Sequence, residues 1–249
     1  MSNIEGIQIH FNSKYSISFN NNLTSDCNFF LNNRLEIPNQ HYLFVSVVHA
    51  NIPYSFYNIN SNNNFLSYTI NSITYTLTIT KGNYNALNLV NFINSNLQTG
   101  FTCSYNSITN KITFLHTTYE FQLNSISSIL SVLGISSSNL ISSNKTLTSD
   151  LCLNLQSCQT INILSNLNVG NLCLCELNTS NILCSIPVSQ QPFSNIIYVN
   201  QNNFRNNLYS NVLNFIKLKL VDEHFRPIDL NGLHWSCSLE ISIYDFNLD

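Results

Sequence analysis

The chain has 249 residues, of which 44% are hydrophobic and only 8% are charged, and its net charge is −3. A typical globular protein has about 25% charged residues, so neutral amides and hydroxyls supply most of the polarity here. The nine basic residues form no run, which argues against nucleic-acid binding as a main role because such binding needs clustered Lys and Arg. The hydrophobic content is enough for a sizeable core, and an all-β chain of this length can be one domain.

The N-terminal stretch MSNIEGIQIHF has neither the basic region nor the apolar region of a signal peptide. The longest apolar runs, such as LFVSVV at 43–48, are far shorter than a membrane span. The sequence therefore predicts synthesis in the cytoplasm and no membrane span.

The first third of the chain has the alternation and the residue types of β-strands. Residues 7–19 alternate in two short runs, and 28–38 form another extended segment that Pro38 closes. Residues 41–56, HYLFVSVVHANIPYSF, predict a mostly buried strand that ends near Pro53.

Residues 64–80 predict a hairpin that turns at Asn71–Ser72, and residues 101–116 predict a second one that turns around 106–110. Between them, residues 83–100 are the best helix candidate, because Leu87, Val90, Phe92 and Leu97 roughly follow helical spacing and Gly100 sits where a helix stops. Residues 125–135 predict a short helical turn that Gly134 ends.

Residues 136–149 have the weakest pattern and are predicted to form a surface loop. Further short strands are expected within 150–164, 181–190 and 195–201. Frequent short strands with at most two short helices are typical of a sandwich or jelly roll. We find no repeat or linker, so we predict one all-β single jelly-roll domain over 1–249, with 1–22 as an N-terminal arm or edge strands.

The segment 221–246, VDEHFRPIDLNGLHWSCSLEISIYDF, concentrates charge in a chain that has little. Its pattern favours folding over chemistry. One face of a strand would carry apolar residues, namely Trp235, Cys237, Leu239, Ile241 and Ile243. Earlier, Ile216, Leu218 and Leu220 alternate with Lys217 and Lys219. We therefore predict a closing hairpin of two amphipathic strands, with Trp235 in the core and the charged residues in the connection.

No catalytic, cofactor-binding or metal-binding residues are predicted. The carboxylates Glu120, Glu176 and Glu240 each stand alone, and the six His form no metal-binding or catalytic motif. A pair of carboxylates that meets only in space, as in glycosidases, stays open. Cys173, Cys175 and Cys184 could hold a metal, but without a Cys-x-x-Cys or paired His motif the eight Cys are better explained as small buried apolar residues.

Several segments, in order, resemble one viral family. The stretches 36–60 (EIPNQHYLFVSVVHANIPYSFYNIN), 81–94 (KGNYNALNLVNFIN), 110–114 (NKITF), 129–135 (ILSVLGI) and 221–241 resemble penton (vertex) capsid proteins of virophages, polinton-like viruses and related large DNA viruses. The resemblance covers roughly residues 27–246 and is loose over 136–195.

The resemblance implies a single jelly roll, five copies of which close each icosahedral vertex beside the major capsid protein. It implies location in the virion and no catalytic residues. One alternative is a minor or cement capsid protein at another position. Another is a carbohydrate-binding attachment protein, for which Tyr54, Phe56 and Tyr57 are the nearest aromatic cluster, although a buried strand end explains these residues equally well. A hydrolase on a β scaffold is the weakest alternative.

Overall fold

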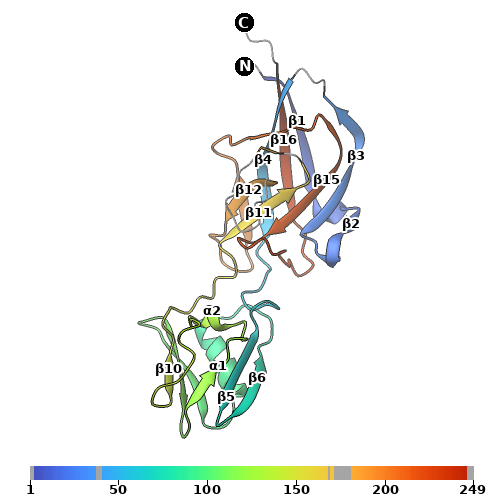
Figure 1. Ribbon diagram of the computed structural model, residues 1–249. Helices are drawn as coiled ribbons and strands as arrows, with labels where there is room; N and C mark the ends of the chain where they lie inside the picture. Colours follow the sequence, from blue (N-terminus) through green and yellow to red (C-terminus); the bar gives the residue numbers. More distant parts are fainter. Residues whose placement is uncertain (1–2, 38–40, 168, 171–180, 246–249) are drawn as a thin grey trace. The chain divides into compact units, whose positions relative to one another are not determined.

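The computed structural model describes residues 3–37, 41–167, 169–170 and 181–245, and strands dominate them (Figure 1). The chain divides into two compact units: residues 1–56 with 158–249 form unit 1, and residues 57–157 form unit 2. Each unit has its own hydrophobic cluster. The sequence predicts one domain, and no linker-like composition marks the two points where the chain passes between the units. Whether both units unfold as one domain stays a prediction.

Unit 1 is an antiparallel sandwich of two five-stranded sheets. Its strands are β1 (Asn3–Asn12), β2 (Ser18–Phe19), β3 (Asp26–Glu36), β4 (His41–Pro53), β11 (Thr160–Ser165), β12 (Ile182–Pro187), β13 (Asn195–Val199), β14 (Asn206–Asn207), β15 (Val212–Val221) and β16 (Ser236–Asp245). Two short 3-10 helices, η1 (Ser13–Tyr15) and η2 (Asn20–Asn22), flank β2.

The strand order is that of a jelly roll. In the described residues one sheet runs β1-β16-β4-β13, with β14 also on β4, and the other runs β12-β11-β15-β3-β2. If β1, β3, β4, β11, β12, β13, β15 and β16 are numbered one to eight, the two sheets read 1-8-3-6 and 5-4-7-2. Consecutive long strands therefore lie in opposite sheets, except for the β11–β12 hairpin. The predicted fold class, an all-β jelly roll with short helices, is confirmed.

The predicted closing hairpin is wrong. The two final strands do not pair with each other: β15 lies between β11 and β3, whereas β16 lies between β1 and β4 in the other sheet. Figure 1 shows β16 beside β1. The alternation along each strand was read correctly, but alternation shows only that one face is buried and does not identify the neighbouring strand.

The apolar face predicted for each final strand is buried as expected. Trp235, Cys237, Leu239, Ile241 and Ile243 all lie in the core of unit 1, and so do Ile216, Leu218 and Leu220. Because β15 and β16 are the central strands of the two facing sheets, they supply the middle of the core. This position explains why their alternation is the clearest in the chain.

Unit 2 contains two three-stranded sheets and two helices, which cover a separate core. Its elements are β5 (Phe65–Ile70), β6 (Ile73–Thr78), α1 (Ala86–Asn96), β7 (Phe101–Asn106), β8 (Lys111–His116), β9 (Phe121–Leu123), α2 (Leu130–Leu133) and β10 (Thr146–Thr148). The sheet orders are β6-β5-β9 and β10-β8-β7.

Both predicted hairpins and both helices are present in unit 2. Asn71 and Ser72 turn between β5 and β6 with positive φ values of 47° and 64°. Gly134 ends α2 in the left-handed region at φ 71°, where a residue without a side chain is favoured. In α1 the buried residues are Leu89, Val90 and Ile93, whereas Leu87 was wrongly placed on the apolar face and is exposed.

The surface loop predicted for residues 136–149 is partly wrong. Thr146–Thr148 form β10, which pairs with β8. Ser142 and Ser149 are buried, and their hydroxyls accept hydrogen bonds from the backbone N–H groups of Phe121 and Ile112. The sequence did not predict this role, because serine is also common in surface loops. Its composition alone does not show that a hydroxyl accepts from the backbone of a neighbouring strand. No helix in the described part of the chain is long and apolar enough to span a membrane.

The ends of unit 2 are held together by one buried amide side chain. Asn58 donates to the carbonyl oxygens of Tyr84 (2.8 Å) and Leu155 (3.1 Å), and its own oxygen accepts from Tyr84 N (2.9 Å). Its backbone N–H donates to the side chain of Asn83. Asn58 lies just after the chain enters unit 2 and Leu155 just before it leaves, so this amide closes the unit.

We expect Asn58→Ala to destabilise unit 2 by about 2–3 kcal/mol, because the substitution leaves buried backbone groups without partners. Urea unfolding followed by hydrogen exchange should show the loss of protection in the strands of unit 2. Asn62→Ala is the matched control, since the Asn62 side chain is exposed. Equal stability of the two variants would contradict the role assigned to Asn58.

Candidate functional site

The charged connection from β15 to β16 crosses between the two sheets of unit 1, and a buried carboxylate organises its first half. Asp222 accepts from the backbone N–H groups of His224 and Arg226, both at 2.9 Å, and from Nε of Arg226 at 2.7 Å. Phe225 adopts a positive φ of 60° in this turn. Glu223 accepts from the backbone N–H of Gln159 at 3.1 Å. These carboxylates therefore satisfy backbone donors and are not arranged around an open site.

The second half of the connection is a tight turn attached to the end of β4. Asp229 accepts from the backbone N–H of Asn231 at 2.8 Å, and Asn231 and Gly232 have φ values of 50° and 80°. Asn231 donates to the carbonyl of Ser55, and the Ser55 hydroxyl donates to the carbonyl of Leu230 at 2.6 Å. The Asn-Gly pair supplies the two left-handed positions that such a turn needs.

Trp235 ends the connection inside the core, as predicted, with 3% of its surface exposed. Its indole N–H donates to the carbonyl of Thr24 at 3.0 Å. Its backbone N–H donates to the hydroxyl of Ser13, and its carbonyl accepts from Ser13 N at 2.9 Å. The ring thus has its polar atom satisfied and serves as a core anchor that joins the C-terminal part of the chain to η1 and to the start of β3.

The remaining titratable residues are dispersed. Glu120 in unit 2 accepts from the hydroxyl of Ser142 and from Lys145 N, and Glu240 on β16 lies 3.8 Å from Arg205. Glu176 lies outside the described residues. In the part of the chain that the structure describes, no three Cys, His, Asp or Glu side chains are close enough together to hold a metal ion.

Three of the histidines each bond different partners, and no two of these three bond each other. His10 bonds the hydroxyl of Ser238, His234 bonds that of Ser13, and the buried His116 in unit 2 accepts from two backbone N–H groups. His10 and Ser238 lie 2.8 Å apart, and among the described residues no carboxylate bonds the His10 ring, as the third member of a catalytic triad would.

The nearest grouping of basic residues, Lys217 and Lys219, neutralises one buried carboxylate. Their ammonium groups lie 3.4 and 3.5 Å from Asp26, which also accepts from Asn20 at 2.7 Å. Only 4% of the Asp26 side chain is exposed, so the carboxylate needs these partners. The two lysines on β15 therefore form ion pairs with β3, the neighbouring strand of the same sheet.

Most described cysteines are small buried residues, as predicted. Burial raises the pKa of Cys27 to about 11 and the pKa values of Cys103, Cys158 and Cys184 to about 12. Burial raises the pKa of Cys237 as well. These thiols stay protonated at neutral pH, which makes them poor nucleophiles and poor metal ligands. Cys152 is exposed, and Cys173 and Cys175 lie outside the described residues.

Of the three aromatic residues considered for carbohydrate binding, two are buried, which agrees with the alternative that they belong to a buried strand end. Tyr54 and Phe56 are 6% and 5% exposed and stack on each other with centroids 4.4 Å apart. They belong to the core of unit 1.

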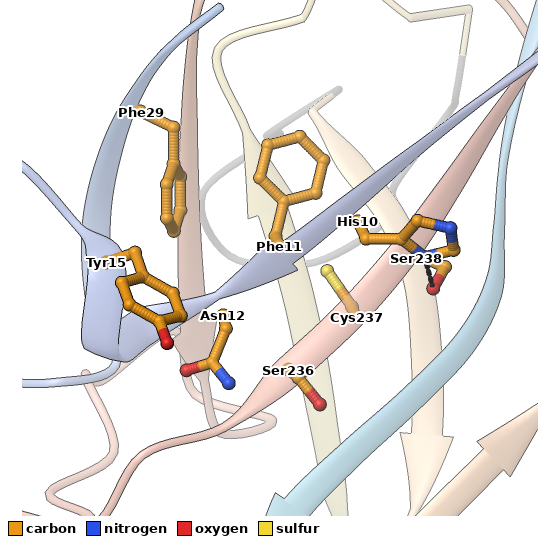
Figure 2. A pocket seen from close by; sticks show the side chains of 8 residues that line it. All are labelled: His10, Phe11, Asn12, Tyr15, Phe29, Ser236, Cys237 and Ser238. Atoms are coloured by element: carbon orange, nitrogen blue, oxygen red, sulfur yellow. Dashed lines mark hydrogen bonds between the residues drawn. The ribbon is translucent and has the colours of Figure 1, made fainter.

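A cavity of about 410 Å³ opens beside β1 instead (Figure 2). Phe11 and Phe29 meet edge to face with centroids 5.0 Å apart, and Tyr15 of η1 stands beside them with 74% of its surface exposed. The other residues that line the cavity come from β1 and β16, namely His10, Asn12, Ser236, Cys237 and Ser238. The sequence does not predict this cavity, because β1 and β16 lie far apart along the chain.

We expect Trp235→Ala to lower the free energy of unfolding of unit 1 by about 3–5 kcal/mol, because it leaves a large cavity in the core. Trp235→Phe should cost less, since it keeps most of the ring and loses the hydrogen bond to Thr24. Denaturant unfolding of the isolated chain measures both variants. Normal stability combined with failed self-association would instead place Trp235 at an interface.

We expect stability to fall as pH rises above 9, because burial raises the pKa of Cys184 from 9.0 to about 12. A thiol whose pKa is higher in the folded state stabilises fully below its unfolded pKa and loses this contribution as pH rises toward the folded value. The loss is about 1.4 kcal/mol per pH unit for each such thiol. Cys184→Ala should reduce the slope of unfolding free energy against pH by that amount, and an unchanged slope would contradict the assignment.

Comparison with known proteins finds a likeness in structure alone. No family model matches the chain, and no curated protein matches it in sequence. Among solved structures, the chain is similar to the crystal structure of the mavirus penton protein, with a TM-score of 0.51 and 14% sequence identity. The match covers 96% of this chain and 99% of that one. It therefore spans both units, and the chain has a penton-like all-β fold.

Proposed function

We propose that this protein is a structural component of a viral capsid, and specifically the penton that closes the five-fold vertices. The observation that carries the proposal is the likeness to the mavirus penton protein over nearly the whole of both chains, including the unit inserted between β4 and β11. The order of sequence segments that resembles penton proteins supports the same conclusion. Under this proposal the chain acts in the virion, after synthesis in the host cytoplasm.

The site chemistry agrees with a structural role. The carboxylates of the β15–β16 connection bind backbone groups of their own chain, and the buried thiols are protonated. We therefore assign no catalytic residue, metal or cofactor. The proposed partners are further copies of the chain and the major capsid protein.

One edge of the jelly roll suits contact with another copy. Strand β13 lies at the end of its sheet and, within the described residues, pairs on one side only, with β4. Ile197 and Val199 on this strand are 64% and 53% exposed. Neither Lys nor Pro interrupts β13, although such residues commonly protect a free edge from association. A ring of identical subunits joins two different surfaces of each copy, and we propose β13 as one of them.

We expect Ile197→Asp to abolish self-association and to leave the melting temperature of the monomer almost unchanged, because the side chain is exposed. Native mass spectrometry of the purified chain should show five copies for the parent protein and a monomer for the variant. Leu87→Asp is the matched control, since Leu87 is also 64% exposed but lies in unit 2.

Three outcomes would contradict parts of the proposal. Three copies in place of five would favour a minor or cement capsid protein. Equal loss of assembly in both variants would remove β13 as the specific contact. Absence of the chain from the five-fold vertices of purified virions, seen by cryo-electron microscopy, would overturn the penton assignment.

A further inference from the structure

The turn at residues 230–233, in the second half of the β15–β16 connection, contains the only Asn–Gly pair of the sequence. Asn231 and Gly232 have positive φ values of 50° and 80°, and both residues are exposed. No described atom lies within 4 Å of the position that a Cβ on Gly232 would take. The backbone of Gly232 is therefore open on the side where other residues carry a side chain.

The peptide nitrogen of Gly232 is also free of hydrogen bonds, whereas its two neighbours are held. The N–H of Asn231 donates to Asp229 at 2.8 Å, and that of Leu233 donates to the carbonyl of Leu230 at 3.0 Å. Within the described residues the N–H of Gly232 donates to no acceptor. A peptide nitrogen that follows an asparagine can attack the side-chain carbonyl carbon and close a five-membered ring. A glycine favours this attack because it has no side chain to obstruct it.

Two contacts with Ser55 restrain the amide that would be attacked. The NH₂ group of Asn231 donates to the carbonyl of Ser55, and the Ser55 hydroxyl donates to the carbonyl of Leu230 at 2.6 Å. Ring closure needs the amide carbon to turn toward the nitrogen of Gly232, so the first of these bonds has to open. The second bond holds the turn against the end of β4 and limits how often this opening occurs.

We propose that Asn231 is a site of spontaneous deamidation and that the contacts with Ser55 set its rate. The nitrogen of Gly232 forms a bond to Cγ of Asn231, and the bond from Cγ to Nδ2 breaks. The proton of the attacking nitrogen passes through solvent to the departing group, which leaves as ammonia. Water then opens the resulting succinimide at either carbonyl and supplies the oxygen of a new carboxylate. The product is aspartate or isoaspartate, and the reaction needs only water, so it does not depend on the proposed capsid role.

The product cannot hold the turn as the amide does. A carboxylate has no N–H to donate to the carbonyl of Ser55. It also adds a negative charge beside Asp229, whose carboxylate accepts from the N–H of the same residue. Isoaspartate lengthens the main chain by one methylene group as well. We therefore expect deamidation to release this part of the connection from the end of β4.

Peptide mapping of the purified chain, incubated at neutral and at mildly alkaline pH, measures the reaction at each asparagine. Asn71 is the internal comparison, because Asn71 and Ser72 are exposed and have φ values of 47° and 64° in a turn of unit 2. We expect Asn231 to react faster than Asn71, since a serine follows Asn71. The rate should rise with pH, because the attacking nitrogen has to lose its proton.

Ser72→Gly tests the role of the following glycine. The substitution creates a second Asn–Gly pair in a hairpin turn whose positive φ values suit glycine, so the fold should be kept. Asn71 should then deamidate faster than it does in the parent protein, while the rate at Asn231 should not change. An unchanged rate at Asn71 would contradict the assigned role of the glycine.

Ser55→Ala tests the restraint. The substitution removes the bond to the carbonyl of Leu230, which still accepts from Leu233 N. Deamidation of Asn231 should become about fivefold faster, the change in population that corresponds to one lost hydrogen bond. Ser194→Ala is the matched control, because it removes another bond from a hydroxyl to a carbonyl in unit 1 and should leave the rate unchanged.

The proposal is overturned if Asn231 keeps its amide during the incubation, if Asn71 reacts faster, or if Ser55→Ala deamidates at the parent rate. Asn231→Asp mimics one product and gives a readout that does not depend on the rate. Its backbone amides in the connection and at the end of β4 should exchange hydrogen faster than those of the parent. Equal exchange in the two proteins would overturn the structural consequence.

Discussion

The jelly roll of this protein depends on the central positions of its last two long strands. Strand β16 pairs with β1 on one side and β4 on the other, and β15 pairs with β11 and β3. Without them each sheet would separate into two parts. Their inward residues also form the middle of the core, where Trp235 is buried and hydrogen-bonded to Thr24. The C-terminal quarter of the sequence therefore supplies a central strand to each of the two sheets.

The connection between these strands explains why so uncharged a chain has a cluster of charges there. A segment that crosses between sheets leaves backbone N–H groups without strand partners, and such groups need acceptors. Asp222, Glu223 and Asp229 provide them. The segment then bonds Ser55, Ser13 and Thr24, so residues close to both ends of the described chain are fixed to one another. In this connection the carboxylates bond backbone groups of the same chain.

The sequence predicted buried strand faces and turns, which depend on neighbouring residues. It did not predict which strands pair when they are far apart along the chain. Alternation identified the buried face of β16, and Asn71–Ser72 and Gly134 marked turns, because each signal depends on a few neighbouring residues. The pairing of β16 with β1 and β4 depends on residues far away in the sequence, so the closing hairpin was a wrong inference from a correct pattern. The division into two units could not be predicted, because no change in composition marks the two points where the chain passes between them. The cavity beside β1 could not be predicted, since Asn12 and Ser236 meet only in the folded chain.

The strand order also has a consequence for how the protein is made. A ribosome releases β1, β3 and β4 long before their main partners, because β1 waits for β16, β3 for β15, and β4 for β13, β14 and β16. Unit 2 pairs its strands only within residues 57–157 and can fold while translation continues. The nascent chain therefore holds several strands with open edges until translation reaches residue 245. During this interval, protection from aggregation has to come from chaperones or from the rarity of encounters between nascent chains.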